Sequence, residues 1–168
     1  WSSDVCSSDL NMRKANYDKF PSTKLTGMLV QGWDSIISML KKKMDARKVL
    51  AVDLYTGVYE EEVLGAFSKE FSGRVMNVRD LMKPEKEIQA LTERFMTEDV
   101  LFGYVTNLRL EDYLDADKVA AARKQISEAK ETIVIIGTGA AVVAPQDAMV
   151  VYADMARWEI QQRFRRHE

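Results

Sequence analysis

The chain has 168 residues, with 24 basic and 26 acidic side chains and a formal net charge of −2 at pH 7. This balance excludes the strongly basic surface typical of nucleic-acid-binding domains, so we expect no nucleic-acid partner. A single cysteine excludes a disulfide framework, and every apolar run is shorter than the ~20 residues of a membrane-spanning helix, so we expect a cytoplasmic domain without a membrane partner.

The first ten residues, WSSDVCSSDL, match a translated sequencing-library adapter rather than natural protein sequence. We therefore set residues 1–11 apart as an adapter-derived artefact, to be left out of any reasoning about the fold. Met12 then becomes the expected native start, and residues 12–30 form an N-terminal arm. The remaining residues, 31–168, are enough for one domain with a buried core, which we expect to be cut off before a further, catalytic domain.

The spacing of apolar residues predicts alternating helices and strands along this domain. In chain order, we predict a helix from near Gly32, a strand over 48–55, a helix over 60–71, a strand over 73–81, a helix over 83–96, a strand or loop over 99–108, a helix over 115–129, strands over 131–140 and 147–154, and a helix over 155–166. Such alternation predicts an α/β fold with three layers, a mostly parallel sheet flanked by helices. Ligands of such sheets bind beyond the carboxyl ends of the strands, so the loops after Tyr55, Ile136 and Asp154 are the candidate sites.

The stretch AVDLYTGVYEEEV, residues 51–63, has the layout of a phosphate-binding loop, because a strand, a glycine turn and a helix start follow one another. When Gly57 is aligned with the last glycine of G-x-x-x-x-G-K-[ST], a valine takes the lysine position and a tyrosine takes the hydroxyl position. Three glutamates, residues 60–62, then fill the first helical turn, where they stabilise the helix dipole and repel a polyphosphate. We interpret the loop as a tight turn before an acid-capped helix, in which Thr56 and Gly57 remain candidate ligand contacts.

The stretch IIGTGAAVV places two glycines, Gly137 and Gly139, directly after the most apolar predicted strand. Glycine lets the backbone approach another group closely, but the third glycine of a dinucleotide-binding fingerprint is missing. Two interpretations therefore stay open, a close approach to a ligand or a close approach to a neighbouring helix.

The stretch YADMARWEIQQRFRR combines a carboxylate at the end of a strand with a helix rich in arginine. Asp154 suits a Mg²⁺ ligand or a general base, and it suits a helix cap equally well. The candidate phosphate-binding arginines of this helix are Arg157, Arg163 and Arg165. Arginines can clamp a phosphate through paired hydrogen bonds, but they also stabilise the negative end of a helix dipole. The residues expected to pack inward are spaced by four: Ala156, Ile160 and Phe164.

The single histidine, His167, cannot form a transition-metal site without cysteines, and no Ser/His/Asp arrangement is present. We therefore expect no catalytic residue and no metal ligand in this chain.

The order of the predicted elements resembles a uridine-kinase-like or phosphoribulokinase-like P-loop domain. In that family a strand, loop and helix open the fold, and here IIGTGA and VVYADMARWEIQQRFRR resemble its late strand and its closing strand–helix unit. The resemblance implies a P-loop-kinase-like fold with a degenerate Walker A loop. It leaves a diverged nucleoside or sugar kinase as an alternative.

A second resemblance is carried by RKANYDKFPSTK, GWDSI, YTGVYEEEV, LFGYVTNLRLEDYLD and YADMARWEIQQRFR. From about Arg13 onward these segments resemble the amino-terminal region of long bacterial proteins described as class I mannose-6-phosphate isomerases. In that family a separate cupin barrel, with zinc held by His, Glu and Gln ligands, converts mannose 6-phosphate to fructose 6-phosphate.

This second resemblance implies a non-catalytic accessory domain in carbohydrate metabolism, with the cupin domain as an intramolecular partner and zinc only in that missing domain. No cofactor is expected in the chain itself. A phosphorylated small molecule or a nucleotide is a further candidate ligand, and a purely structural docking module is a further alternative.

Overall fold

The computed structural model describes residues 21–24, 26–44, 48–99 and 102–167. Gln31–Glu168 is a compact unit. The predicted adapter-derived segment and most of the predicted arm lie outside the described residues. The described residues before Gln31 contain neither helix nor strand.

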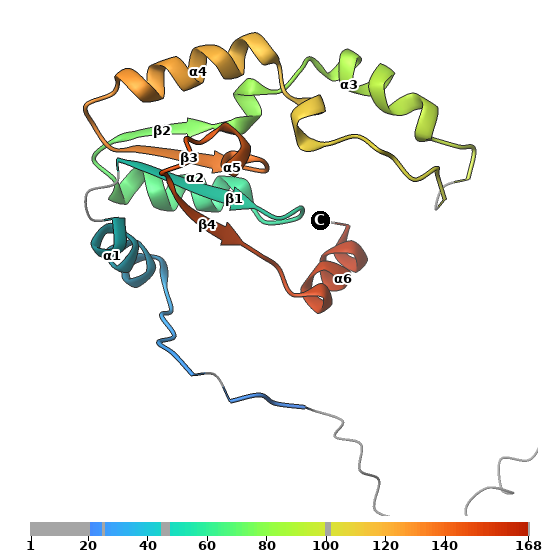
Figure 1. Cartoon of the computed structure of the whole chain (residues 1–168). Coiled ribbons are helices and arrows are strands. Elements are labelled where there is room, and N and C mark those ends of the chain that lie inside the picture. The colour runs from blue at the N-terminus through green and yellow to red at the C-terminus, as the bar shows by residue number, and fades with distance from the viewer. Residues whose placement is uncertain (1–20, 25, 45–47, 100–101, 168) are drawn as a thin grey trace, which may run out of the picture. The chain divides into compact units, whose positions relative to one another are not determined.

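Helices and strands alternate through most of this unit, with two α-helices in succession between the second and third strands (Figure 1). In chain order they are α1 (Trp33–Met44), β1 (Val49–Leu54), α2 (Glu60–Glu70), β2 (Arg74–Asn77), α3 (Glu85–Thr92), α4 (Ala116–Glu128), β3 (Ile133–Gly137), α5 (Ala140–Val143), β4 (Met149–Ala153) and α6 (Arg157–Arg166). Short 3₁₀ helices lie at Val78–Leu81, Glu93–Phe95 and Leu110–Tyr113.

The four strands form one sheet in the order β2-β3-β1-β4, and every pairing is parallel. Strand β1 is central, with Val49 opposite Ile133 of β3 and Leu50 opposite Met149 of β4. All five residues of β3 are buried, as its unbroken apolar sequence predicts for a strand that is covered on both faces. The predicted three-layer α/β fold is therefore confirmed.

Helices cover the two faces of the sheet, with α4 on one side and α1 and α2 on the other (Figure 1). Alternate residues of β1 point to opposite faces, so Val49 and Ala51 pack with α4 and α5, whereas Leu50 and Val52 pack with α1 and α2. The largest side chain that is fully buried is Phe67 of α2. Helix α5 has only four residues, so it covers little of the sheet.

Local sequence explains where several elements begin and end. Helix α1 buries Ile37, Leu40 and Met44, three residues of its predicted apolar face. Asp115 caps α4 by accepting hydrogen bonds from the backbone N–H groups of residues 117 and 118.

Two predictions need correction, and one open alternative is decided. The strand predicted over 73–81 ends at Asn77, because the Asn77 side chain accepts a hydrogen bond from Arg79 N at 2.7 Å and turns the chain into a 3₁₀ helix. Of the two alternatives for the segment after Asp99, strand or loop, residues 102–108 form a loop. In α6 two of the three residues predicted to pack inward are exposed, Ala156 and Phe164, the latter at 77%. The third, Ile160, is half-buried as predicted, and Arg163 on that side is half-buried as well.

Candidate functional site

The candidate site lies at the carboxyl ends of β1 and β3. From these adjacent strands the chain continues to opposite faces, because α2 packs beside α1 whereas α5 packs beside α4. A crevice outside such a switch in direction is the usual binding place in an open α/β sheet. A cavity of about 300 Å³ lies here, bordered by the loop after β1, by the start of α2, by Arg79 and by Thr138.

The loop after β1 is a tight turn. Val58 N donates to Tyr55 O at 3.1 Å, and Gly57 has a φ of 94°, a left-handed conformation that glycine adopts without strain. Two of the acidic residues that follow bind other parts of the domain. Glu60 accepts from Asn77 Nδ2 at 2.6 Å, and Glu62 accepts from Trp33 Nε1 at 3.0 Å. This geometry agrees with the interpretation of a turn before an acid-rich helix.

Arg163 reaches this turn from α6. Its Nη1 donates to Gly57 O at 2.5 Å, and its Cζ lies 3.7 Å from the centroid of the Tyr59 ring, which is a cation–π contact. Its Nε donates to Glu159 at 3.2 Å. The guanidinium thus holds both the turn and the Tyr59 ring, although Arg163 and Gly57 are more than 100 positions apart along the chain.

The other two candidate arginines lie on the exposed side of α6. Arg157 is exposed, and Arg165 lies with its Cζ 6.0 Å from the Trp158 ring. The structure therefore brings one of the three arginines to the loop after β1. Hydrogen bonds from Arg163 and Arg166 lower the pKa of Glu159, because both stabilise its charged form.

Asp53 is a site residue that the sequence reasoning missed. Its carboxylate accepts from Gly139 N at 3.0 Å and from Ala141 N at 2.9 Å, so it binds the backbone donors of the glycine-containing loop after β3. Thr138 joins the same two loops by donating its hydroxyl to Leu54 O at 3.0 Å. The signal was present in the sequence, because Asp53 is the one charged residue in the apolar strand β1.

The two glycines of this loop have different roles. A Cβ at Gly137 would lie 2.9 Å from the Cβ of Val78, so the close approach is to the 3₁₀ helix that follows β2. Gly139 has a φ of 87° and precedes α5. Of the two interpretations left open for Gly137, packing against a neighbouring helical segment fits the contacts.

Asp154 lies after β4 and is exposed. Its Oδ1 accepts from Met155 N at 2.8 Å, and the N-cap of α6 is Ala156, so the interpretation of Asp154 as the cap of that helix is wrong. The pKa of Tyr152 is raised, mainly because partial burial disfavours its charged form. Smaller contributions come from repulsion by the ionisable groups of Asp154, Tyr55 and Asp53. These groups lie together at the carboxyl ends of β1 and β4. Among the described residues, no group of three or more His, Cys, Asp or Glu side chains is placed to hold a metal ion.

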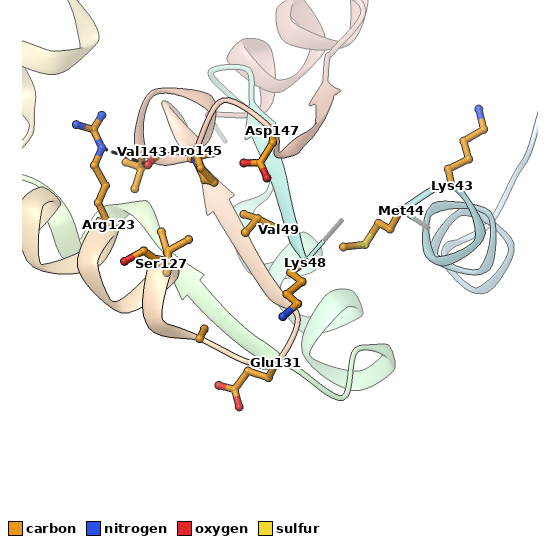
Figure 2. A pocket seen from close by; sticks show the side chains of 13 residues that line it. Lys43, Met44, Lys48, Val49, Arg123, Ser127, Glu131, Val143, Pro145 and Asp147 are labelled. Carbon is orange, nitrogen blue, oxygen red and sulfur yellow. Dashed lines mark hydrogen bonds between the residues drawn. The ribbon is translucent and has the colours of Figure 1, made fainter. Parts of the chain in front are cut away.

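A larger hollow of about 950 Å³ lies at the opposite, amino-terminal end of the strands (Figure 2). Val49, Ile126 and Val143 give it an apolar floor, while its border carries charges of both signs. Arg123 uses its guanidinium to bind the carbonyl oxygens of Val142 and Val143, at 2.7 and 3.4 Å. Lys43 extends away from the other labelled side chains in Figure 2. Because the charged groups do not converge, the hollow gives no indication of a particular ligand.

The fold and the contacts define a small three-layer α/β domain whose two carboxyl-edge loops are held by hydrogen bonds within the domain. The chain belongs to the family described as Domain of unknown function (DUF8485), which matches residues 32–168. No curated protein and no solved structure matches the chain. Within the described part of the chain, no helix is both long and apolar enough to cross a membrane.

Proposed function

We propose that this chain is a non-catalytic accessory domain of a mannose-6-phosphate isomerase-type protein, with a P-loop-like fold that has lost phosphate binding at its first loop. The isomerisation would belong to a zinc-containing cupin domain elsewhere in the same protein. The cytoplasm is the proposed location, because the parent reaction uses a phosphorylated sugar.

The observation that carries the non-catalytic part is the internal use of both candidate anion-binding loops. The backbone N–H groups of Gly139 and Ala141 are the donors that a phosphate oxygen would need, and they already donate to the Asp53 carboxylate. Such a carboxylate and a bound phosphate would compete for the same donors and would repel each other.

The loop after β1 gives a second, independent argument. Arg163 is bound to Gly57 O, to Glu159 and to the ring of Tyr59, so its charge is directed at protein groups. The cavity at this edge is bordered by one cation, Arg79, and by two carboxylates, Glu60 and Glu61. An excess of negative charge at this border disfavours the triphosphate of a nucleotide.

Isothermal titration calorimetry with ATP, UTP and mannose 6-phosphate, each with Mg²⁺, tests the loss of binding. We expect no saturable heat and no change in melting temperature with any of the three. Saturable binding of a nucleotide, together with Mg²⁺-dependent turnover that Asp154→Asn lowers sharply, would instead support the alternative of a diverged small-molecule kinase.

The accessory role has its own test, which is the reading frame downstream of residue 168. A cupin domain with clustered His and Glu residues would support the proposed parent protein, and an immediate stop codon would contradict it. If a cupin follows, removal of this domain from the full-length protein separates the remaining roles. Unchanged isomerase activity and an unchanged oligomeric state would leave a purely structural docking module.

A further inference from the structure

The two edges of the sheet differ in how well they are protected from another strand. Strand β2 has four residues, begins with the exposed Arg74 and turns directly into a 3₁₀ helix. Strand β4 lies at the other edge, and among the described residues no strand pairs with its outer side. Its five residues, Met149–Ala153, include no charged residue and no proline. Two of the usual features that block strand addition, charged side chains and proline, are therefore missing from the strand itself.

The hydrogen bonds of β4 show which of its backbone groups remain at the outer side. Ala153 O accepts from Tyr55 N at 2.9 Å, so residue 153 faces the neighbouring strand segment. Because backbone groups alternate along a strand, the N–H and C=O groups of Val150 and Tyr152 point to the outer edge. The side chains of these two residues are 54% and 58% exposed, whereas the alternate residues pack against the cluster that includes α1 and α2.

We propose that β4 is a self-association surface, on which two copies of this chain pair their β4 strands antiparallel about a two-fold axis. The two four-stranded sheets then continue into one another. A two-fold arrangement satisfies both free edges at once, because the same strand supplies both sides of the contact.

The register follows from the outward-pointing residues. Val150 lies opposite Tyr152 of the second copy, and Tyr152 lies opposite Val150 of the second copy, so each pair exchanges both backbone hydrogen bonds. A β-branched residue opposite an aromatic residue is a favourable cross-strand pair. Val151 lies on the two-fold axis, with its side chain on the face that the α1 and α2 cluster covers.

The neighbouring registers are less favourable. A shift by two residues, the next register that keeps the outward-pointing groups paired, would place Val150 opposite either Val150 or Asp154 of the second copy and would lose both Val150–Tyr152 pairs. In the proposed pairing Asp154 lies opposite Ala148 and Asp147 lies opposite Met155, so the two carboxylates do not meet. The chain's net charge of −2 adds little long-range repulsion between copies.

The expected dimer is weak. A five-residue strand buries less than the roughly 1,200–2,000 Å² of a standard interface, so we expect association that depends visibly on concentration. The pairing also takes the residues after Asp154 past the turn at residues 145–148 of the second copy, which enlarges the contact beyond the strand.

Sedimentation velocity of the whole chain, from about 1 µM to about 1 mM, tests the proposal. A reducing agent is needed, because Cys6 could otherwise cross-link two chains. We expect the weight-average sedimentation coefficient to rise with concentration toward that of a dimer. A monomer over the whole range would overturn the proposal.

Two double variants test the surface and the register, and a third variant is their control. Val150→Lys with Tyr152→Lys places like charges opposite each other twice, and we expect it to abolish association. Val150→Glu with Tyr152→Lys places opposite charges in the same two pairs, and we expect it to restore association. Val105→Lys changes a residue that is 98% exposed and distant from β4 in sequence, and we expect no effect.

Circular dichroism melts confirm folding of all three variants, which is expected because each position is more than half exposed. Unchanged association in the double lysine variant would refute β4 as the surface. A monomeric Glu/Lys variant would refute the antiparallel register.

Discussion

Replacing Asp53 by asparagine is the most direct test of how the carboxyl edge of the sheet is held. The carboxylate accepts two backbone hydrogen bonds, from Gly139 at 3.0 Å and from Ala141 at 2.9 Å. An asparagine keeps one acceptor oxygen and turns an NH₂ group toward the other backbone N–H, so at least one of the two bonds is lost. Hydrogen bonds to charged groups contribute about 1.5–3 kcal/mol each.

We expect Asp53→Asn to lower the free energy of unfolding by about 2 kcal/mol. This value is near the lower end of the range expected when one such hydrogen bond is lost and the other is weakened. The low value follows from exposure, because Asp53 is half-buried and Ala141 is exposed, so water can replace part of the interaction. For a domain of this size, the melting temperature should fall by roughly 4–8 °C.

Urea unfolding followed by circular dichroism measures this change, with Asp154→Asn as the control. The control carboxylate is also near the edge, but its one described bond is to the adjacent residue, so its substitution should cost less than about 0.5 kcal/mol. If both variants unfold at the same urea concentration as the unchanged chain, the Asp53 contacts contribute no stability and the reasoning is refuted.

Three further predictions use the same denaturation assay. Arg163→Ala should destabilise the domain by about 1–2 kcal/mol by removing the hydrogen bond and ring contact to the turn, whereas Arg165→Ala on the exposed side should be close to neutral; equal losses would contradict this. Gly137→Ala should lower the free energy of unfolding by about 2 kcal/mol or more, because residue 137 has a φ of 135° and the new Cβ would lie 2.9 Å from the Cβ of Val78. Gly65→Ala in α2 is the control and should be stabilising by about 0.5–1 kcal/mol. A Gly137 variant as stable as the unchanged chain would refute the close contact. The pKa of Glu159 is lowered in the folded state, so its contribution to the free energy of unfolding is fully present above its unfolded pKa and is lost as the pH falls through the folded pKa. Glu159→Gln should therefore flatten the acid side of the plot of unfolding free energy against pH. An unchanged slope on the acid side would count against the arginine contacts.

Much of the fold could be predicted because its elements have strong local signals. The apolar run of β3 and the 3.6-residue periodicity of α1 depend on burial alone, and the spacing of apolar residues in the sequence indicates directly which residues are buried. The end of β2 had no such signal, because it depends on the side chain of Asn77 binding the backbone two residues later. Likewise, α6 is short and follows an edge strand. The contact of Arg163 with Gly57 O, rather than burial of the helix's aromatic residues, sets which side of α6 faces the domain.

The meeting of two of the three candidate loops was predictable, but the contacts that these loops make were not. The loops at the carboxyl ends of β1 and β3 do adjoin one cavity, as their place after parallel strands implies. Two contacts decide what those loops do, and each joins residues 86 or more positions apart, from Asp53 to Gly139 and from Arg163 to Gly57. Spacing along a single sequence carries no information about such pairs, so the lone aspartate in β1 was a visible but unused clue.

The central place of β1 has a consequence for the order in which the protein can be made and folded. Val49 pairs with Ile133, and Leu50 pairs with Met149, so both neighbours of the first strand are synthesised long after it. Until then its apolar side chains have no sheet to join, and parallel pairing over such distances is slow because a long loop must close first. A ribosome that stalls anywhere between residues 55 and 133 would therefore present an unpaired apolar strand to the cell. We expect such interrupted chains to be clients of chaperones or to aggregate, rather than to form a stable half-domain.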